Sequence, residues 1–398
     1  MRSMSRPTRR RLAAPRASLS TGPGALGVRQ VRLLAWVALG LLLAASPGGA
    51  DDGAGWRLFR SNPALTGVLD GELPQALEAL WVFEAGDSIE SSAAIVDGRV
   101  FVGSLDGHLY ALDLATGDEL WRFATTMEVK SSPSVFDDTV YFGDESGSFH
   151  ALDAASGEQR WVFETGGGII SAANYSNGIL VFGSYDNNLY AVNASDGTVR
   201  WSITTNGYVN GTPAIADGQV VSVGCDGVLR MIDLDDGTIL ATIDIGAYVA
   251  ASPAILDGIA YFGTFENQVL AIDLAGRGAR WVYEHPKRKF PYYSSAAVTA
   301  DTVFLGGRDK MVHAIDRATG APRWTYTSRA RVDSSPVVVG GRVLIGGSSG
   351  DLVILDSGTG EMLWQFETGS SIVATPALAD GRVVVGTEDG VLYCFGRP

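Results

Sequence analysis

Seven cationic and three aromatic side chains lie close together in the second half of the sequence, and their chemistry suits an anionic ligand. Positive charge attracts anions and raises their local concentration, while aromatic side chains anchor many binding interfaces. We therefore predict binding of an anionic polymer, a lipid head group or an acidic partner segment. The alternative is a solvated basic loop without a ligand. The residues are Lys287, Arg288, Lys289, Arg308, Lys310, Arg329 and Arg331, with Phe290, Tyr292 and Tyr293.

The residue types that perform catalysis form no recognisable constellation. Two cysteines, Cys225 and Cys394, cannot build a disulfide framework or hold a structural zinc ion alone. The four histidines show no serine–histidine–aspartate pattern. Carboxylates recur at hairpin positions, where they are typical turn formers: Asp106, Asp186, Asp226 and Asp389. We therefore predict no catalytic residue and no metal site, which favours a protein that is not an enzyme.

The composition indicates many short strands joined by tight turns. Of 398 residues, 46% are hydrophobic and 50 are glycine, without the glycine period of collagen. The apolar content excludes wholesale disorder. The net charge of −14 argues against a nucleic-acid binder, because phosphate binding requires clustered cations.

Residues 1–50 are predicted to be a signal peptide. They hold eight arginines and no acidic residue, then an apolar run at 33–45 that is too short to span a bilayer. An anchor that is kept is the alternative, and the translation start and cleavage site stay open. No cysteine lies near the predicted cleavage region, so we expect an exported, soluble protein of the periplasm or the extracellular space rather than a lipoprotein. Without this segment, 22 cations face 44 acids, a net charge of −22.

Residues 51–79 form a lead-in, and from residue 80 the chain repeats itself with a period near 40. A period of this size is typical of solenoids, propellers and arrays. A tryptophan marks this repeat everywhere except at one position, which Ala241 occupies instead. We expect the weakest packing between neighbouring repeat units there. The repeat is marked by Trp81, Trp121, Trp161, Trp201, Trp281, Trp324 and Trp364.

Each repeat contains four short strands and no helical periodicity, which predicts an all-β, eight-bladed β-propeller of four-stranded antiparallel blades over residues 80–398. The chain ends inside the third strand of the last repeat. A strand at residues 80–84 precedes the first repeat, so we expect it to complete the last blade and close the ring.

The blade motif resembles a known family. Ala111, Asp113, Thr116, Gly117 and Trp121 read A-x-D-x-x-T-G-x-x-x-W, and the same pattern recurs from Ala314 to Trp324. This resembles the tryptophan-docking repeat of the PQQ-type (pyrroloquinoline quinone) eight-bladed propellers. The group includes quinoprotein dehydrogenases and the outer-membrane assembly factor BamB. The segment from Trp56 to Gly67 is similar to the lead-in of these proteins.

The resemblance implies a test for the cofactor. The enzymes of this group hold PQQ between a central tryptophan and, in one branch, a disulfide of adjacent cysteines, with a calcium ion at the quinone. Here Cys225 and Cys394 fall in opposite blades, and every tryptophan after residue 50 except Trp56 is a docking residue. We therefore expect no cofactor; PQQ and calcium belong only to the alternative of a dehydrogenase with a reduced site.

Two loops of each repeat vary around the ring while the others keep their Asp-Gly and Thr-Gly turns, and the variable loops open on one face. Positions that vary against a constant repeat are not needed for packing, so they are candidates for specificity. Drift in solvent loops is the alternative. Besides the basic cluster, the candidates are Glu90, Lys130, Asn210, Asp333, Tyr185 and Phe265.

The sequence thus predicts a monomeric, non-catalytic binding or scaffold module of the BamB-like kind, without nucleic acid or a transmembrane span in the mature chain. Its partner would be a protein or an anionic ligand on the variable face. A saccharide-binding propeller using Tyr185, Phe265 and Tyr293 is a further alternative. The edge between the Trp56 lead-in and the strand at 80–84 is a second candidate docking place.

Overall fold

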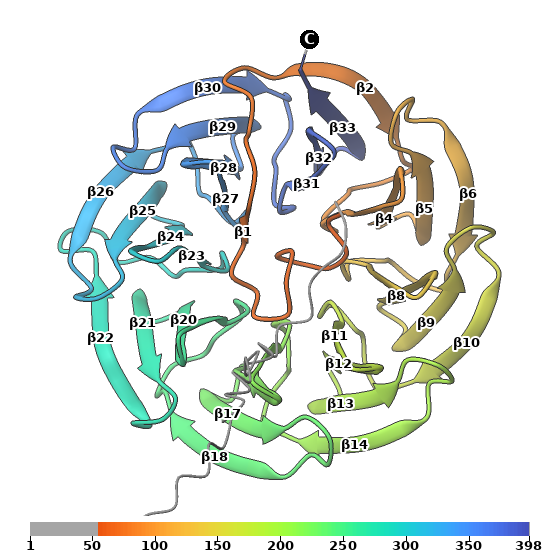
Figure 1. Ribbon diagram of the computed structural model, residues 1–398, viewed down its shortest axis with the longest axis horizontal. Coiled ribbons are helices and arrows are strands. Elements are labelled where there is room, and N and C mark those ends of the chain that lie inside the picture. Colours follow the sequence, from red (N-terminus) through yellow and green to blue (C-terminus); the bar gives the residue numbers. More distant parts are fainter. Residues whose placement is uncertain (1–54, 398) are drawn as a thin grey trace, which may run out of the picture. The chain divides into compact units, whose positions relative to one another are not determined.

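A computed structural model describes residues 55–397, which form a ring of eight four-stranded antiparallel blades (Figure 1). Blade one holds β3–β6, and each following blade takes the next four strands. Blade seven has a fifth strand, and blade eight combines three C-terminal strands with one N-terminal strand. The predicted propeller is confirmed. The predicted signal peptide at residues 1–50 lies outside the described residues.

In each blade the four strands are arranged side by side, from the innermost strand at the centre of the ring to the outer strand at its wall (Figure 1). The innermost strands are β3 (Ala94–Val96), β7 (Ser134–Phe136), β11 (Asn174–Ser176), β15 (Ala214–Ala216), β19 (Ala254–Leu256), β23 (Ala297–Val298), β27 (Val337–Val339) and β31 (Ala377–Ala379). The second strands are β4 (Arg99–Ser104), β8 (Thr139–Gly143), β12 (Ile179–Gly183), β16 (Gln219–Ser222), β20 (Ile259–Gly263), β24 (Thr302–Gly306), β28 (Arg342–Gly346) and β32 (Arg382–Gly386). The third strands are β5 (His108–Asp113), β9 (Ser148–Asp153), β13 (Asn188–Asn193), β17 (Val228–Asp233), β21 (Gln268–Asp273), β25 (Met311–Asp316), β29 (Asp351–Asp356) and β33 (Val391–Gly396). The outer strands are β6 (Glu119–Ala124), β10 (Gln159–Glu164), β14 (Val199–Thr204), β18 (Ile239–Asp244), β22 (Gly278–Glu284), β26 (Pro322–Thr327), β30 (Met362–Glu367) and β2 (Glu78–Glu84).

Burial follows the position of a strand in its blade. The second strand of blade two, TVYFG in β8, is buried throughout, since blades cover it on both sides. The outer strand of the same blade, QRWVFE in β10, alternates between exposed and half-buried residues because one of its faces meets water. The hydrophobic core is therefore a series of clusters between adjacent blades.

The N-terminal strand β2 closes the ring. It pairs antiparallel with β33, the last strand of the chain, and Trp81 lies opposite Cys394 in this ladder. The predicted closure by residues 80–84 is therefore confirmed, with the strand extending over Glu78–Glu84. The backbone N–H and C=O groups that β2 and β33 would otherwise leave exposed therefore bond to each other.

Six of the seven docking tryptophans pack on a glycine of the next blade, and Trp364 instead lies against Phe366 and Phe395. Trp81 lies against Gly117, where an added Cβ would come within 2.7 Å of the indole, and the φ of +80° there also favours glycine. Six of these indoles donate a hydrogen bond to a backbone carbonyl of the next blade, over 2.8–3.2 Å. By the same spacing of 36 residues, Ala241 faces Arg277, which has a φ of +53°. Blade four, which lacks the docking tryptophan, therefore adjoins blade five, which lacks the glycine at the corresponding turn position.

The lead-in crosses the centre of the ring (Figure 1). Its carbonyl groups accept hydrogen bonds from equivalent backbone N–H groups of the innermost strands in six blades: those of Ile95, Val135, Ile215, Ile255, Val298 and Val338. Blade three reaches the same segment through the Asn174 side chain, whose Nδ2 donates to the Pro63 carbonyl over 2.7 Å. β1 (Val68–Leu69) then pairs parallel with β27.

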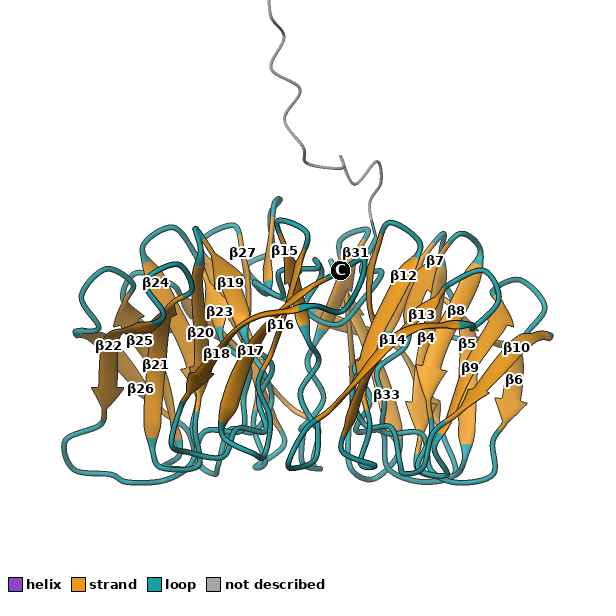
Figure 2. Ribbon diagram, turned by 90° about the horizontal axis from the view of Figure 1, so that it is seen from below, coloured by secondary structure: helices purple, strands orange, loops and turns teal. Residues whose placement is uncertain are grey.

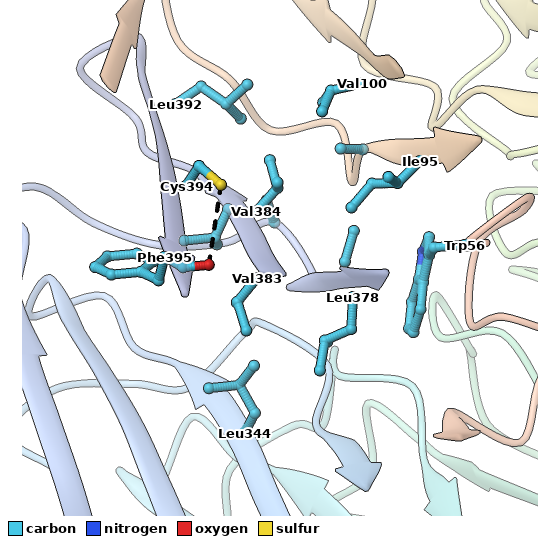
Figure 3. Packing of buried hydrophobic residues seen from close by; sticks show 14 of the residues in the cluster. Trp56, Ile95, Val100, Leu344, Leu378, Val383, Val384, Leu392, Cys394 and Phe395 are labelled. Carbon is cyan, nitrogen blue, oxygen red and sulfur yellow. Dashed lines mark hydrogen bonds between the residues drawn. The ribbon is translucent and has the colours of Figure 1, made fainter. Parts of the chain in front are cut away.

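Two buried side chains of the lead-in hold it in place. Trp56 is fully buried and packs in the core between blades eight and one, near Ile95 and Leu378 (Figure 3). Arg60 is also fully buried, and its guanidinium donates to the carbonyls of Pro336 at 2.5 Å and Ala296 at 2.7 Å. Burial lowers the pKa of Arg60 to about 9. The centre of the ring is therefore filled by the chain itself.

Candidate binding face

The two faces of the ring differ as the sequence predicts. One face, here called the loop face, carries the connections between blades and the hairpins between second and third strands. In all eight blades, a backbone N–H of the hairpin donates to a carbonyl of the preceding connection, over 2.9–3.4 Å. The Tyr185 N–H, for example, donates to the Gly168 carbonyl over 2.9 Å. These bonds hold the loops in a fixed ring, so their side chains are presented by a rigid frame.

An aromatic sector lies over blades three to five. Tyr185 stacks on Tyr208 with ring centroids 4.6 Å apart, and its hydroxyl donates to the Oδ1 atom of Asn210 over 2.9 Å. Tyr208 and Tyr248 are 51% and 62% exposed, at equivalent positions of successive blades. Large exposed tyrosines in a fixed frame are typical of binding surfaces.

A second stack joins the aromatic sector to the basic one. Phe265 lies 4.7 Å from the ring centroid of Tyr293, and the Arg308 guanidinium sits 3.5 Å from the same centroid. Arg308 also donates to both oxygens of Asp333, over 2.9 and 3.1 Å. The flat faces of Tyr185, Phe265 and Tyr293 are thus already in contact with neighbouring groups, which leaves Tyr248 as the more open ring for stacking.

The structure divides the seven predicted cations into two groups. Arg308 and Arg331 share Asp333, and Arg329 pairs with Asp351 and Glu367. By contrast, no ion pair joins Lys287, Arg288, Lys289 or Lys310 to another residue within 55–397; Arg288 donates to the Asp309 carbonyl over 2.6 Å. The net positive charge of this sector is therefore concentrated at its connection after β22 and at Lys310.

Tyr292 does not belong to the surface. It is only 2% exposed, its ring lies 5.4 Å from that of His313, and burial raises its pKa. Gly263 makes room for it, since a Cβ there would lie 2.3 Å from the Tyr292 Cβ. The prediction of Tyr292 as a binding residue is therefore wrong: it anchors the base of the connection in the core.

An acidic sector lies at the opposite part of the face. Lys130 pairs with Glu145 over 2.7 Å, and Glu90 and Glu388 lie near them. Burial raises the pKa of Glu90; Lys130 lowers it, and the neighbouring carboxylates add to the increase. One lysine among three glutamates leaves this sector negative. The loop face is thus divided into acidic, aromatic and basic parts.

The carboxylates of the hairpins are structural. Asp106 accepts a hydrogen bond from the Tyr110 hydroxyl over 2.6 Å, and Asp186 does so from Tyr190 at the same distance. In blade four the partner is Arg230, which donates to Asp226 over 2.5 Å. These contacts tie each turn to its own third strand and agree with the predicted role as turn formers.

The residues do not fit PQQ as the resemblance implies its binding. Trp56 is buried against the blades and presents no open face, and the lead-in occupies the centre of the ring. Cys225 and Cys394 are free thiols. Within residues 55–397 no three His, Cys, Asp or Glu side chains converge as metal ligands.

The opposite face, here called the turn face, has several cavities at blade boundaries. One of about 400 Å³ lies between blades two and three and includes Arg160 and Arg200. Another of about 230 Å³ lies between blades four and five, next to Met231 and Leu274. A third, of about 290 Å³, lies between residues 69–74 and the first turn of blade eight, at the second docking place suggested by the sequence.

Comparison with known proteins supports the fold. A family model described as "Outer membrane protein assembly factor BamB" matches residues 70–174, 164–288 and 308–396. No curated protein sequence matches the chain. BamB from Moraxella catarrhalis is similar in structure, with 19% identity and a TM-score of 0.69, over 81% of this chain and all of that one.

An enzyme shares the architecture as well. Quinohemoprotein alcohol dehydrogenase from Comamonas testosteroni superposes with 15% identity and a TM-score of 0.73, over 87% of this chain and 81% of that one. The computationally designed Ika8 protein does so with 18% identity and a TM-score of 0.71, over 82% and 100%. At these identities, the likeness concerns the fold alone. In the part of the chain that the structure describes, no helix is long and apolar enough to cross a membrane.

Proposed function

The chain belongs to the family of the outer membrane protein assembly factor BamB, and from that premise we propose that it is a non-catalytic scaffold that binds a protein partner through its loop face. We further propose that it is exported, acts as a monomer and carries no cofactor. The sectors of the loop face support the first of these statements most directly.

The observation that carries the proposal is the combination of a rigid frame and exposed aromatic side chains. Eight backbone hydrogen bonds fix the loops, and Tyr208 and Tyr248 project from this frame without being needed for blade packing. Tyrosine gives a large contact area with little loss of side-chain entropy, and interface centres are enriched in it. The acidic and basic parts on either side favour one orientation of the partner, because charge complementarity selects against the reverse one.

A dehydrogenase is less well supported by the same geometry. A quinone needs an open aromatic floor and a metal site, and the described residues offer neither at the centre of the ring. A saccharide site would use Tyr248 rather than the three stacked rings predicted from the sequence. We therefore retain the scaffold as the proposed function.

Site-specific photo-crosslinking in the native cell envelope tests the proposal. A photoreactive amino acid replaces Tyr208 or Tyr248 on the loop face, or Asp97 or Asp217 on the turn face as matched exposed controls. We expect one discrete crosslinked partner band from both loop-face positions and none from the controls. Bands of equal strength from both faces would contradict the assignment, and so would a loop face that forms no protein adduct.

A further inference from the structure

The connection that follows β22 is unlike the other seven. It is three residues longer than its equivalents and bulges outward at the left edge of both overall views (Figures 1 and 2). Pro286, Lys287, Lys289 and Phe290 are exposed, and Phe290 keeps 50% of its surface in water. A large apolar side chain at the outer rim of the loop face contributes nothing to the core beneath it.

The base of this connection is held firmly. The His285 ring nitrogen Nδ1 accepts from the Arg288 backbone N–H over 3.1 Å, and the Arg288 side chain donates to the Asp309 carbonyl over 2.6 Å. Tyr292 is buried, and Tyr293 is packed between Phe265 and Arg308. The tip therefore projects from an anchored base, which reduces the entropy lost when it binds.

The charge at the tip is not neutralised. Lys287, Lys289 and Lys310 have no carboxylate partner within residues 55–397, whereas Arg308, Arg329 and Arg331 of the same sector do. In a chain whose net charge is −22 after residue 50, three unpaired lysines around an exposed phenylalanine form a local site for negative charge.

We propose that the tip, residues 286–290 with Lys310, docks on a membrane surface that contains anionic phospholipid. Phe290 would enter the interfacial region while the lysines contact several head groups, as flexible ammonium groups do at a charged leaflet. Phospholipid fits better than an acidic peptide, because a peptide would need a groove beside the lysines, whereas a bilayer accepts a protruding tip. The inference does not depend on the protein partner of the aromatic sector.

Co-sedimentation with vesicles tests it. The purified protein is mixed with phosphatidylcholine vesicles, or with the same vesicles containing phosphatidylglycerol, at low and high salt. We expect binding only to the anionic vesicles and its loss at high salt. Each lysine near an anionic surface strengthens binding roughly fivefold, so Lys287→Ala, Lys289→Ala and Lys310→Ala together should weaken it roughly a hundredfold. Phe290→Ser should weaken it as well.

The matched control removes three exposed arginines elsewhere, Arg122, Arg277 and Arg280, by the same change to alanine. Its net charge equals that of the lysine variant, so an equal loss in both variants would overturn the proposal. Equal binding to neutral and anionic vesicles would also overturn it. A third outcome would overturn it too: the protein binds polyglutamate but not vesicles, and the lysine variant loses the binding of polyglutamate. That result would assign the tip to an acidic protein segment. Crosslinking through Tyr248 is measured on the same variants and reports separately on the partner site.

Discussion

The boundary between blades four and five can be repaired by restoring both halves of the docking contact. Ala241 stands where seven other outer strands carry tryptophan, and Arg277 stands where the indole would need glycine. At the intact boundaries an added Cβ would come within 2.6–2.8 Å of the indole. We therefore predict that Ala241→Trp fails alone and succeeds only together with Arg277→Gly.

The magnitudes follow from the contact. Arg277 has a φ of +53°, so glycine relieves about 1 kcal/mol of backbone strain, partly offset by the greater freedom of glycine in the unfolded chain. A docked indole buries roughly 150–200 Å², worth about 4–5 kcal/mol as an upper bound. After the loss of side-chain entropy, we expect the double variant to gain about 1–3 kcal/mol, or roughly 1–4 °C in Tm.

Thermal and urea unfolding of four proteins measures the effect: the parent, each single variant and the double variant. Ala241→Trp alone should be neutral or destabilising, because the Arg277 Cβ occupies the place of the indole. The coupling free energy should be favourable by at least about 1 kcal/mol. Additive single effects would refute the reasoning, since they would mean that the tryptophan and residue 277 do not touch.

The remaining predictions concern closure, pH and thiols. Trp81→Ala should lower the free energy of unfolding by about 2–4 kcal/mol, measured in urea, and expose β2 to proteases. Trp161→Ala should lower it by as much but leave β2 protected. Hydrogen bonds from Arg323 and Thr319 lower the pKa of Asp316 to about 2. The ionised carboxylate therefore stabilises the turn above pH 4, and this contribution disappears as the pH falls towards 2. In the Asp316→Asn variant, the measured Tm should depend less on pH over that range. Burial raises the pKa of Cys394 to about 11, so its thiol should resist alkylation at pH 8 until the protein unfolds, as mass spectrometry of labelled peptides would reveal.

The architecture was predictable because its determinants are repeated. A tryptophan every 40 residues and turn signals between short strands specify the blades, and the missing outer strand of the last repeat points to its replacement near Trp81. Because eight repeats carry the same pattern, a departure in one of them does not obscure it. The number of blades and the closure therefore follow from the sequence alone.

The course of the lead-in was not predictable, because its main contacts are made by backbone carbonyls. Such contacts leave no pattern of residue types, and Arg60 reads as an ordinary surface cation until its carbonyl partners 236 and 276 residues away are known. The resemblance to the family suggested a lead-in but gave no position for it.

Two features of the loop face were missed from the sequence. Tyr208 and Tyr248 lie two positions before Asn210 and Ala250, and a comparison of each loop at every position would have found them. Tyr292 was misplaced although the repeat carried a signal: the same position holds Val129 in the first blade-to-blade connection of the series, where it packs on Gly103 as Tyr292 packs on Gly263. The pairing of Arg308 and Arg331 with Asp333 depends on contacts between loops, which the spacing of residues does not specify.

The central position of the lead-in and the pairing of β2 with β33 have a consequence for biosynthesis. The ribosome makes residues 56–84 before any of the complete blades, yet their partners extend to Val338 and to β33. β2 must therefore wait unpaired until β33 has been made, and a chain that stops short of Val391 leaves β2 without its ladder. Completion of the native ring thus requires β33, and chains that terminate before it expose an open edge that proteases and chaperones can recognise.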